Sequence, residues 1–322
     1  MRWLSAALAA LLLLAPAEPS EAAARKAAPA KDQFSSQEKI LQWIDGYRQE
    51  PEPTFLPEVV QAMTRLGLFR DSDAAGLYIG FIAGVLGDNP AQAEKFVTGM
   101  FPMPPEDQGA LIRAIAYSGL PAWKELLGKF VERMPARKVL IDQFLQDKAK
   151  VLNDVALETG PAPVDTLWGY YFATGSFIPV KRIIAALDWS KEKSDVNKLT
   201  VGSVAKWTLA SNAARDKGLL DFLRAEVKVK QHSKDVRAAL KEVVEAAESY
   251  ETGKIRKDAV AAIEELKRRG PQTNPAWTWA GTAIAVGCVA ATASGVGAVA
   301  VGVPCVVGGA LTSAGAKLWG SN

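Results

Sequence analysis

The interpretation of the whole chain starts from residues 275–319, which read PAWTWAGTAIAVGCVAATASGVGAVAVGVPCVVGGALTSAGAKLW. No charged residue occurs from 270 to 316, and Ala, Gly, Val and Thr supply most of the run. This uncharged length is roughly twice the ~20 residues that one helix needs to cross a bilayer. Turn-forming residues at 294–297 lie near its middle. We therefore expect a hydrophobic helical hairpin over 276–319.

A hairpin would return both ends of this segment to the same side. The ends carry amphipathic residues typical of a membrane interface, which are the predicted anchors Trp277, Trp279, Lys317 and Trp319. Small residues recur every four positions within it, so that they share one helical face and let two backbones approach closely. These predicted helix–helix packing residues are Ala283, Gly287, Ala291 and Gly295.

The only two cysteines, Cys288 and Cys305, lie almost equally far from the predicted turn. An antiparallel hairpin would place them side by side, and export would permit a disulfide between them. The alternative is two unpaired cysteines that pack as small apolar side chains. With so few cysteines, the chain is not a disulfide-dense secreted scaffold.

Two features oppose simple membrane integration of the hairpin. Ala and Gly are only mildly apolar, which makes the segment a weak stop-transfer signal. If the body is exported, the basic residues at 267–269 would lie on the side that the positive-inside tendency disfavours. Three interpretations stay open: a hairpin inserted in a membrane, which we favour, a hairpin buried in the fold, and a disordered or glycine-rich β tail.

The N-terminus has the pattern of a signal peptide. Arg2 precedes an apolar run over 4–14, and Ala15-Pro16-Ala17 is a small-x-small cleavage site. We predict a signal peptide over 1–17, with an uncleaved anchor as the alternative, and a flexible leader over 18–34. Export would place the protein in the periplasm or cell envelope, associated with a membrane, or in the medium as a secreted protein.

The rest of the chain predicts an all-α fold. Apolar residues recur at helical spacing in short segments that begin at prolines and end at glycines, and Ser35-Ser36 can cap the first of them. Short helices joined by tight turns pack as antiparallel pairs, which gives an α-solenoid or an irregular helical bundle. We expect a first helical block over 35–150 and a second over 160–270, which ends in long charged amphipathic helices.

A faint internal similarity relates the two blocks. Gly80-Phe81-Ile82 precedes Pro90 by the distance at which Gly169-Tyr170-Tyr171 precedes Pro179. The similarity indicates either a duplicated helix–turn–helix unit or a chance likeness between two amphipathic helix pairs.

Composition and motifs argue against several classes of function. A net charge of +3 favours neither a dedicated nucleic-acid binder nor an enzyme for acidic substrates. The single histidine, His232, lies among lysines in an apparent connector, without neighbours for a metal site or a catalytic triad. The sequence also lacks a phosphate-binding loop and a dinucleotide fingerprint. We expect no enzymatic activity, no cofactor, no metal and no nucleic-acid partner.

Most aromatic residues fall at helical spacing, which is typical of core packing. If the stacked helices form a ligand groove, we expect it at Trp168, Tyr170, Tyr171 and Phe172.

The leading hypothesis is an exported, non-enzymatic helical-repeat protein, whose body binds a protein partner and whose C-terminal hairpin tethers it to membrane lipid. The alternative is a secreted, pore-forming-like protein that releases the hairpin into a bilayer. A third interpretation, an enzyme with an unrecognised helical active site, would need carboxylates with perturbed pKa values in a pocket.

Overall fold

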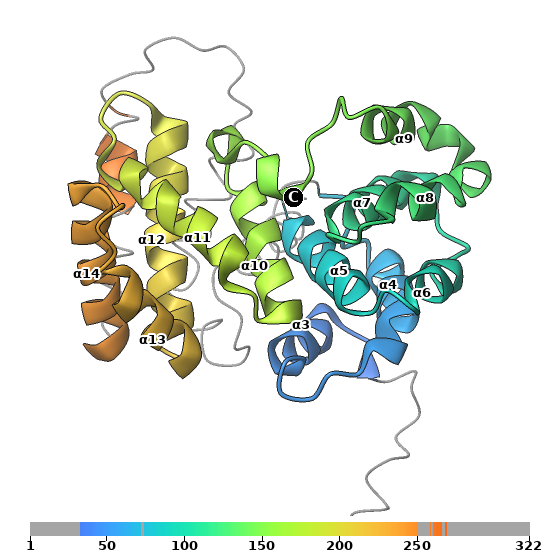
Figure 1. The fold of residues 1–322 in the computed structure, drawn as a ribbon, viewed down its shortest axis with the longest axis horizontal. Coiled ribbons are helices and arrows are strands. Elements are labelled where there is room, and N and C mark those ends of the chain that lie inside the picture. Colours follow the sequence, from blue (N-terminus) through green and yellow to red (C-terminus); the bar gives the residue numbers. More distant parts are fainter. Residues whose placement is uncertain (1–32, 72–73, 250–257, 259, 266–267, 269–322) are drawn as a thin grey trace, which may run out of the picture. The chain divides into compact units, whose positions relative to one another are not determined.

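The computed structural model describes residues 33–71, 74–249, 258, 260–265 and 268. Within these ranges the regular structure is α-helix and short 3-10 helix, without a strand, so the predicted all-α fold is confirmed there (Figure 1). The predicted signal peptide (1–17), almost all of the predicted leader (18–34) and the predicted hairpin (276–319) lie outside the described residues. Among the helices described, none combines the length and the apolar character needed to cross a bilayer.

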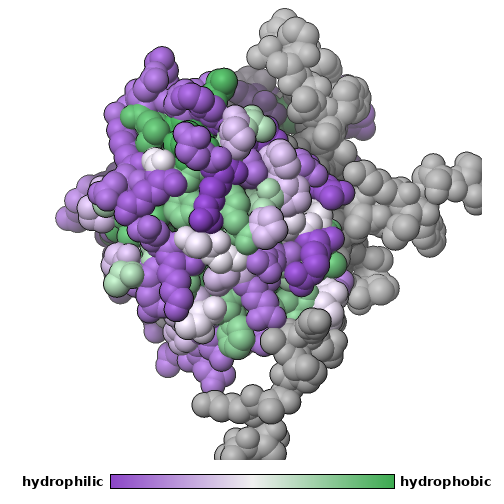
Figure 2. Space-filling view, turned by 90° about the vertical axis from the view of Figure 1, so that its right-hand side faces the viewer, coloured by the Kyte–Doolittle hydropathy of each residue, from purple (hydrophilic) through white to green (hydrophobic). Residues whose placement is uncertain are grey.

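The helices before residue 150 are short. In chain order they are α3 (Gln37–Gly46), η1 (Pro53–Phe55), α4 (Leu56–Arg65), α5 (Gly76–Asp88), α6 (Ala93–Gly99), α7 (Pro105–Tyr117), α8 (Trp123–Gly128), η2 (Val131–Arg133), η3 (Pro135–Arg137) and α9 (Lys138–Leu145). The face that α6, α8 and α9 present is mostly hydrophilic, with hydrophobic patches between the polar side chains (Figure 2).

The helices after residue 150 include two longer ones. They are η4 (Leu152–Asp154), η5 (Leu157–Thr159), α10 (Ala162–Thr174), α11 (Phe177–Ala185), η6 (Ala186–Lys191), α12 (Val196–Ala213), α13 (Lys217–Glu226) and α14 (Lys234–Ser249). The first of the charged amphipathic helices predicted at the end of the second block is α14, and its buried stripe includes Val236, Leu240 and Val243.

Several helices begin where a side chain can cap them. Ser36, Asp195 and Asp216 each accept a hydrogen bond from the backbone N–H three residues further on, at 3.4, 3.1 and 3.0 Å. Such a bond satisfies one of the N–H groups that the first helical turn leaves without a partner. The predicted serine cap of the first helix is thus confirmed at Ser36. Gly175, with φ of 69°, ends α10 in the left-handed conformation that glycine adopts without strain.

Helix α5 is enclosed by its neighbours: every residue from Gly76 to Leu86 is buried. It is apolar on all sides, as an enclosed helix must be. Its main partner is α10, and the two lie side by side in Figure 1. A side-chain carbon on Gly80 would collide with the carbonyl group of Thr166, and one on Gly169 would collide with that of Leu77. Glycine is therefore required on both helices for this close approach.

These two glycines occupy the corresponding positions of the suspected duplication. Their place at the crossing of α5 and α10 gives each a packing reason of its own. The duplication itself stays a prediction.

The second half of the core forms where α12 packs against η6 and α14. Trp168 and Trp207 are buried, and the indole N–H of Trp168 donates to the hydroxyl of Thr208 at 2.9 Å. Trp43, Trp123 and Trp189 are partly buried and pack against the same core. The prediction that the tryptophans serve core packing is therefore confirmed for these five.

Candidate functional site

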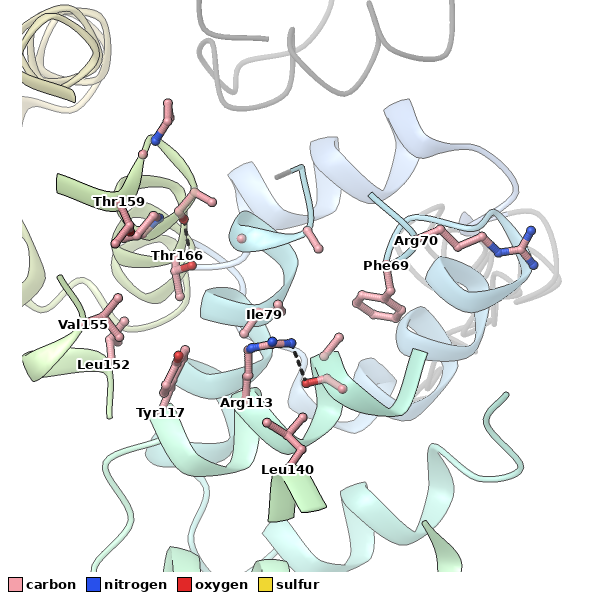
Figure 3. A pocket seen from close by; sticks show the side chains of 18 of the residues that line it. Phe69, Arg70, Ile79, Arg113, Tyr117, Leu140, Leu152, Val155, Thr159 and Thr166 are labelled. Atoms are coloured by element: carbon pink, nitrogen blue, oxygen red, sulfur yellow. Dashed lines mark hydrogen bonds between the residues drawn. The ribbon is translucent and has the colours of Figure 1, made fainter. Parts of the chain in front are cut away.

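A pocket of about 500 Å³ opens where α5, α7, the start of α9 and the 152–166 segment meet (Figure 3). Apolar side chains form much of its wall: Phe69, Ile79, Leu140, Leu152 and Val155. In Figure 3 Arg113 lies between Ile79 and Leu140, while Arg70 stands at the edge. The volume lies within the range of about 300–1,000 Å³ that is common for ligand pockets.

Four arginines line this pocket: Arg70, Arg113, Arg137 and Arg182. They come from separate parts of the chain: Arg70 lies between α4 and α5, Arg113 in α7, Arg137 in η3 and Arg182 in α11. Glu106 is the one carboxylate among the lining residues that the structure describes. The described wall therefore carries an excess of positive charge.

Backbone carbonyl groups hold three of these guanidinium groups in place. Arg137 Nε donates to the carbonyl oxygen of Pro105 at 2.7 Å, and Arg113 Nη1 donates to that of Gly109 at 3.3 Å. Arg182 donates to the carbonyl oxygens of two residues in the 152–155 segment. Carbonyl groups are neutral acceptors, so these bonds orient the guanidinium groups and leave their charge uncompensated.

Within the described ranges, no carboxylate forms an ion pair with any of the four arginines. Burial lowers the pKa of Arg182, and the nearby charges of Asp154 and Glu158 act against that shift without reaching ion-pair distance. The guanidinium group stays charged because the ordinary arginine pKa lies above about 12.

A buried acid follows Glu106 in α7. Asp107 is fully buried in the first turn of α7, and neither oxygen of its carboxyl group has a hydrogen-bond partner. Burial raises its pKa, the charge of Glu106 adds to the rise, and the charge of Arg70 acts against it. A buried carboxylate without hydrogen bonds is costly, which favours the neutral, protonated form.

A second pocket of about 310 Å³ adjoins the first, because Tyr117 and Leu152 line both. Its wall includes the aromatic side chains of Trp123 and Tyr170. Ile178 lies at its edge with 65% of its surface exposed, which is unusual for a large aliphatic residue.

The structure separates the four residues of the predicted groove. Tyr170 lines the second pocket, and its hydroxyl donates to the carbonyl oxygen of Ser118 at 3.3 Å. Trp168, Tyr171 and Phe172 are buried in the core and contact one another through their rings. Only Tyr170 of this set is therefore placed to touch a ligand in a described pocket.

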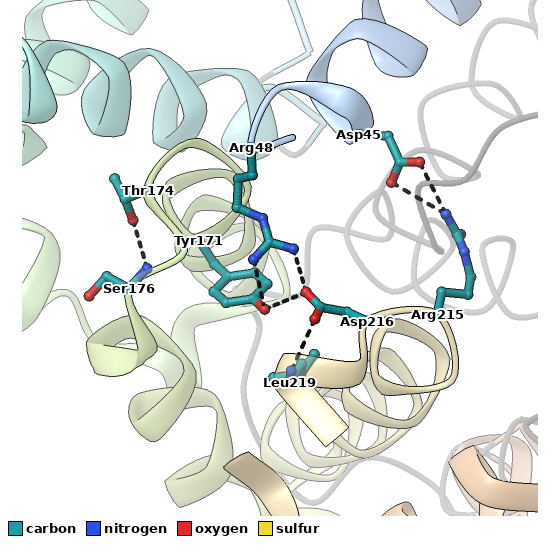
Figure 4. A network of polar contacts seen from close by, with 8 residues as sticks. All are labelled: Asp45, Arg48, Tyr171, Thr174, Ser176, Arg215, Asp216 and Leu219. Atoms are coloured by element: carbon teal, nitrogen blue, oxygen red, sulfur yellow. Dashed lines mark hydrogen bonds and ion pairs between the residues drawn. The ribbon is translucent and has the colours of Figure 1, made fainter. Parts of the chain in front are cut away.

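Tyr171 instead belongs to a polar cluster that joins three helices (Figure 4). The guanidinium of Arg48, just after α3, lies 4.5 Å from the centre of the Tyr171 ring and forms an ion pair with Asp216, the N-cap of α13. The Tyr171 hydroxyl donates to Asp216 at 2.6 Å.

The pKa values of the cluster follow from these contacts. Burial alone would raise the pKa of Asp216, but hydrogen bonds from Tyr171, the Leu219 N–H and Arg48 outweigh it and hold that pKa below its usual value. Burial raises the pKa of the Tyr171 phenol far above its usual value. The cluster fixes α3, α10 and α13 together, which is a structural role.

His232 is not the free connector residue that the sequence indicates. Its Nε2 lies 2.7 Å from Glu226 Oε2, and both side chains are largely covered. No group of three or more His, Cys, Asp or Glu side chains in the described part of the chain is arranged to hold a metal ion.

Sequence reasoning missed the arginine pocket because the four residues lie far apart in the chain and each resembles an ordinary charged position on an amphipathic helix. The predicted anchors, packing residues and cysteines of the 276–319 segment lie outside the described residues. No protein-family model matches this chain, and searches of curated proteins and of solved structures found no significant match.

Proposed function

We propose that the protein is an exported, non-enzymatic binding protein with a body of short antiparallel helix pairs. The body takes a protein partner at the arginine-lined pocket, and the hairpin over 276–319 tethers it to a membrane in the periplasm or cell envelope. The observation that carries the binding role is the pocket itself, in which several arginines are held in place but not neutralised.

Fixing an exposed arginine side chain in one conformation is usually unfavourable, because the long side chain loses conformational entropy. Here hydrogen bonds to backbone carbonyl groups already restrict the side chains of Arg113, Arg137 and Arg182 before any ligand binds. Groups oriented before binding lose less entropy when a ligand arrives. A wall of oriented, uncompensated cations beside apolar side chains is what a binding site for an acidic partner requires.

The tether is supported by the sequence alone. The segment from 270 to 316 contains no charged residue; Trp277 and Trp279 lie near its start, and Trp319 follows its end. Such a segment is unfavourable in water unless lipid or protein covers it.

Fractionation of cells tests the tether. Membranes from cells that produce the full chain, or the chain truncated before residue 276, are washed with alkaline carbonate and probed with antibody to the helical body. We expect the full chain in the membrane pellet and the truncated chain in the supernatant. Equal retention of both chains would rule out the tether.

Liposome leakage separates the tether from the pore-forming alternative. Purified full chain is added to dye-loaded liposomes. A tether leaves the dye trapped, whereas dye release would replace the proposed tether with the membrane-active function.

A further inference from the structure

We propose that the arginine pocket and the adjoining aromatic pocket form one docking groove for an acidic peptide segment that carries an apolar anchor residue. This proposal rests on the partner-binding role above and names the chemistry of the partner. The groove is defined by the four pocket arginines together with Tyr117, Trp123, Tyr170 and Ile178.

The two pockets are neighbours that share part of their walls. Tyr117, at the end of α7, and Leu152, at the start of η4, belong to the walls of both. In Figure 3 both side chains stand on the same side of the basic pocket. An extended peptide that fills one pocket is therefore close enough to place a neighbouring residue in the other.

The basic half selects carboxylates. A guanidinium group has five N–H donors, and the bonds to carbonyl groups use one donor on Arg113 and one on Arg137. The remaining donors match the planar, two-oxygen geometry of a carboxylate. Glu106 adds some negative charge to this half, but the arginines outnumber it.

The arrangement favours a chain with several carboxylates over a single anionic group. Arg70, Arg113, Arg137 and Arg182 stand on four different segments around the pocket. They are thus suited to successive acidic side chains of an extended peptide. A single anionic headgroup would be expected to draw its donors from one helix end or one compact loop.

The aromatic half supplies the anchor. Tyr117, Trp123 and Tyr170 offer ring faces and edges, and Ile178 exposes 65% of its surface beside them. Burial of an apolar side chain here would remove Ile178 from water, which is the main driving force for anchor residues at interfaces.

The test uses full-length protein in detergent micelles and a fluorescein-labelled synthetic peptide in which glutamates flank one tryptophan. Fluorescence anisotropy should show saturable binding that weakens as salt is added. A peptide with lysine in place of glutamate should not bind. A glutamate peptide with serine in place of tryptophan should bind about tenfold more weakly, because burial of a large apolar side chain contributes on that order.

Two substitutions address the two halves, and both replace exposed side chains, so the fold should be retained. Arg113→Gln should weaken binding of the glutamate–tryptophan peptide about tenfold, as expected for one charge-assisted hydrogen bond. Ile178→Gln should weaken it about threefold to tenfold and should leave the serine peptide unaffected. The matched control is Arg215→Gln: Arg215 pairs with Asp45 away from the groove, so binding should change less than about twofold.

Three results would overturn the proposal: equal binding of the glutamate and lysine peptides, equal loss in Arg113→Gln and Arg215→Gln, or displacement of the peptide by phosphatidylglycerol vesicles but not by phosphatidylcholine vesicles. The last would assign the groove to a lipid headgroup. Failure of peptide binding leaves the carbonate fractionation unaffected, so the groove and the tether can fail separately.

Discussion

The pocket between α5, α7 and α9 and the layer formed by α12, α13 and α14 use the same kind of residue in opposite ways. In the α12–α14 layer, Lys206 and Lys191 both approach Glu242, and Arg224 pairs with Glu248. In the pocket, Arg113, Arg137 and Arg182 bind carbonyl groups, and no carboxylate of the described chain forms an ion pair with them.

The difference indicates which charged groups stabilise the folded chain. Burial alone would raise the pKa of Glu242, but Lys206 and Lys191 outweigh it and hold the pKa below its usual value. The carboxylate and its cations thus stabilise each other in the folded chain. The pocket arginines have no ion-paired carboxylate of this kind in the described chain, and neighbouring cations repel one another. Their contribution is therefore expected to appear when a ligand binds.

The crossing of α5 and α10 supports both regions, so breaking it should have the largest effect. Gly80→Val should lower the free energy of unfolding by about 3 kcal/mol or more, because the new side chain would collide with the Thr166 backbone. Urea denaturation followed by circular dichroism measures this. The control is Gly46→Ala, where nothing lies within 4 Å of the added carbon, and which should be neutral or slightly stabilising.

The Arg48–Tyr171–Asp216 cluster is partly enclosed and joins three helices, so its loss should have the next largest effect. Arg48→Gln should cost about 2 kcal/mol, because it removes a charged partner from a half-buried carboxylate. The neighbouring exposed pair gives the control, since Arg215→Gln should cost no more than about 0.5 kcal/mol.

The same cluster predicts a dependence on pH. Because the folded pKa of Asp216 is below its unfolded value, its stabilisation is present above the unfolded pKa, near 4, and is lost as the pH falls through the folded pKa. Urea midpoints from pH 3 to pH 6 should therefore rise more steeply for the natural chain than for Arg48→Gln. Parallel curves would contradict the assignment.

The stability contribution of Asp107, in the first turn of α7, should depend on pH in the opposite sense. Its folded pKa is raised, so its contribution is full below the unfolded pKa and is lost as the pH rises through the folded pKa. Asp107→Asn should therefore stabilise the protein by about 1 kcal/mol at pH 7 and by almost nothing at pH 3. Thermal unfolding at the two pH values distinguishes this from a simple packing effect, which would be the same at both.

The smallest changes in stability are expected for single cations, one in the α12–α14 layer and one in the pocket. Lys206→Gln should lower stability by about 0.5 kcal/mol, because it leaves Glu242 with a weaker partner. Arg113→Gln should change stability by less than about 0.5 kcal/mol, or raise it, because it relieves repulsion within the pocket. A clear loss of stability in Arg113→Gln would show that the arginine is a structural residue.

The sequence was sufficient to predict the helices and their ends, because capping residues such as Ser36 and prolines at helix starts act locally. It also indicated that aromatic residues at helical spacing pack in the core, as Trp168 and Trp207 do. It could not predict which helices meet: the glycines of α5 have a reason only once α10 lies against them. The pocket was missed for the same reason, since Arg113 and Arg182 become neighbours of one pocket only in the folded chain.

Ligand-induced stabilisation tests the central claim most directly, namely that the pocket arginines serve a ligand and the α12–α14 cations serve the fold. The urea midpoint of the full chain is measured with and without the glutamate–tryptophan peptide, for the natural chain, Lys206→Gln and Arg113→Gln. A ligand that binds only the folded state raises the midpoint. We predict a clear rise for the natural chain and Lys206→Gln and almost none for Arg113→Gln. An equal rise in all three, or none in the natural chain, would contradict the claim.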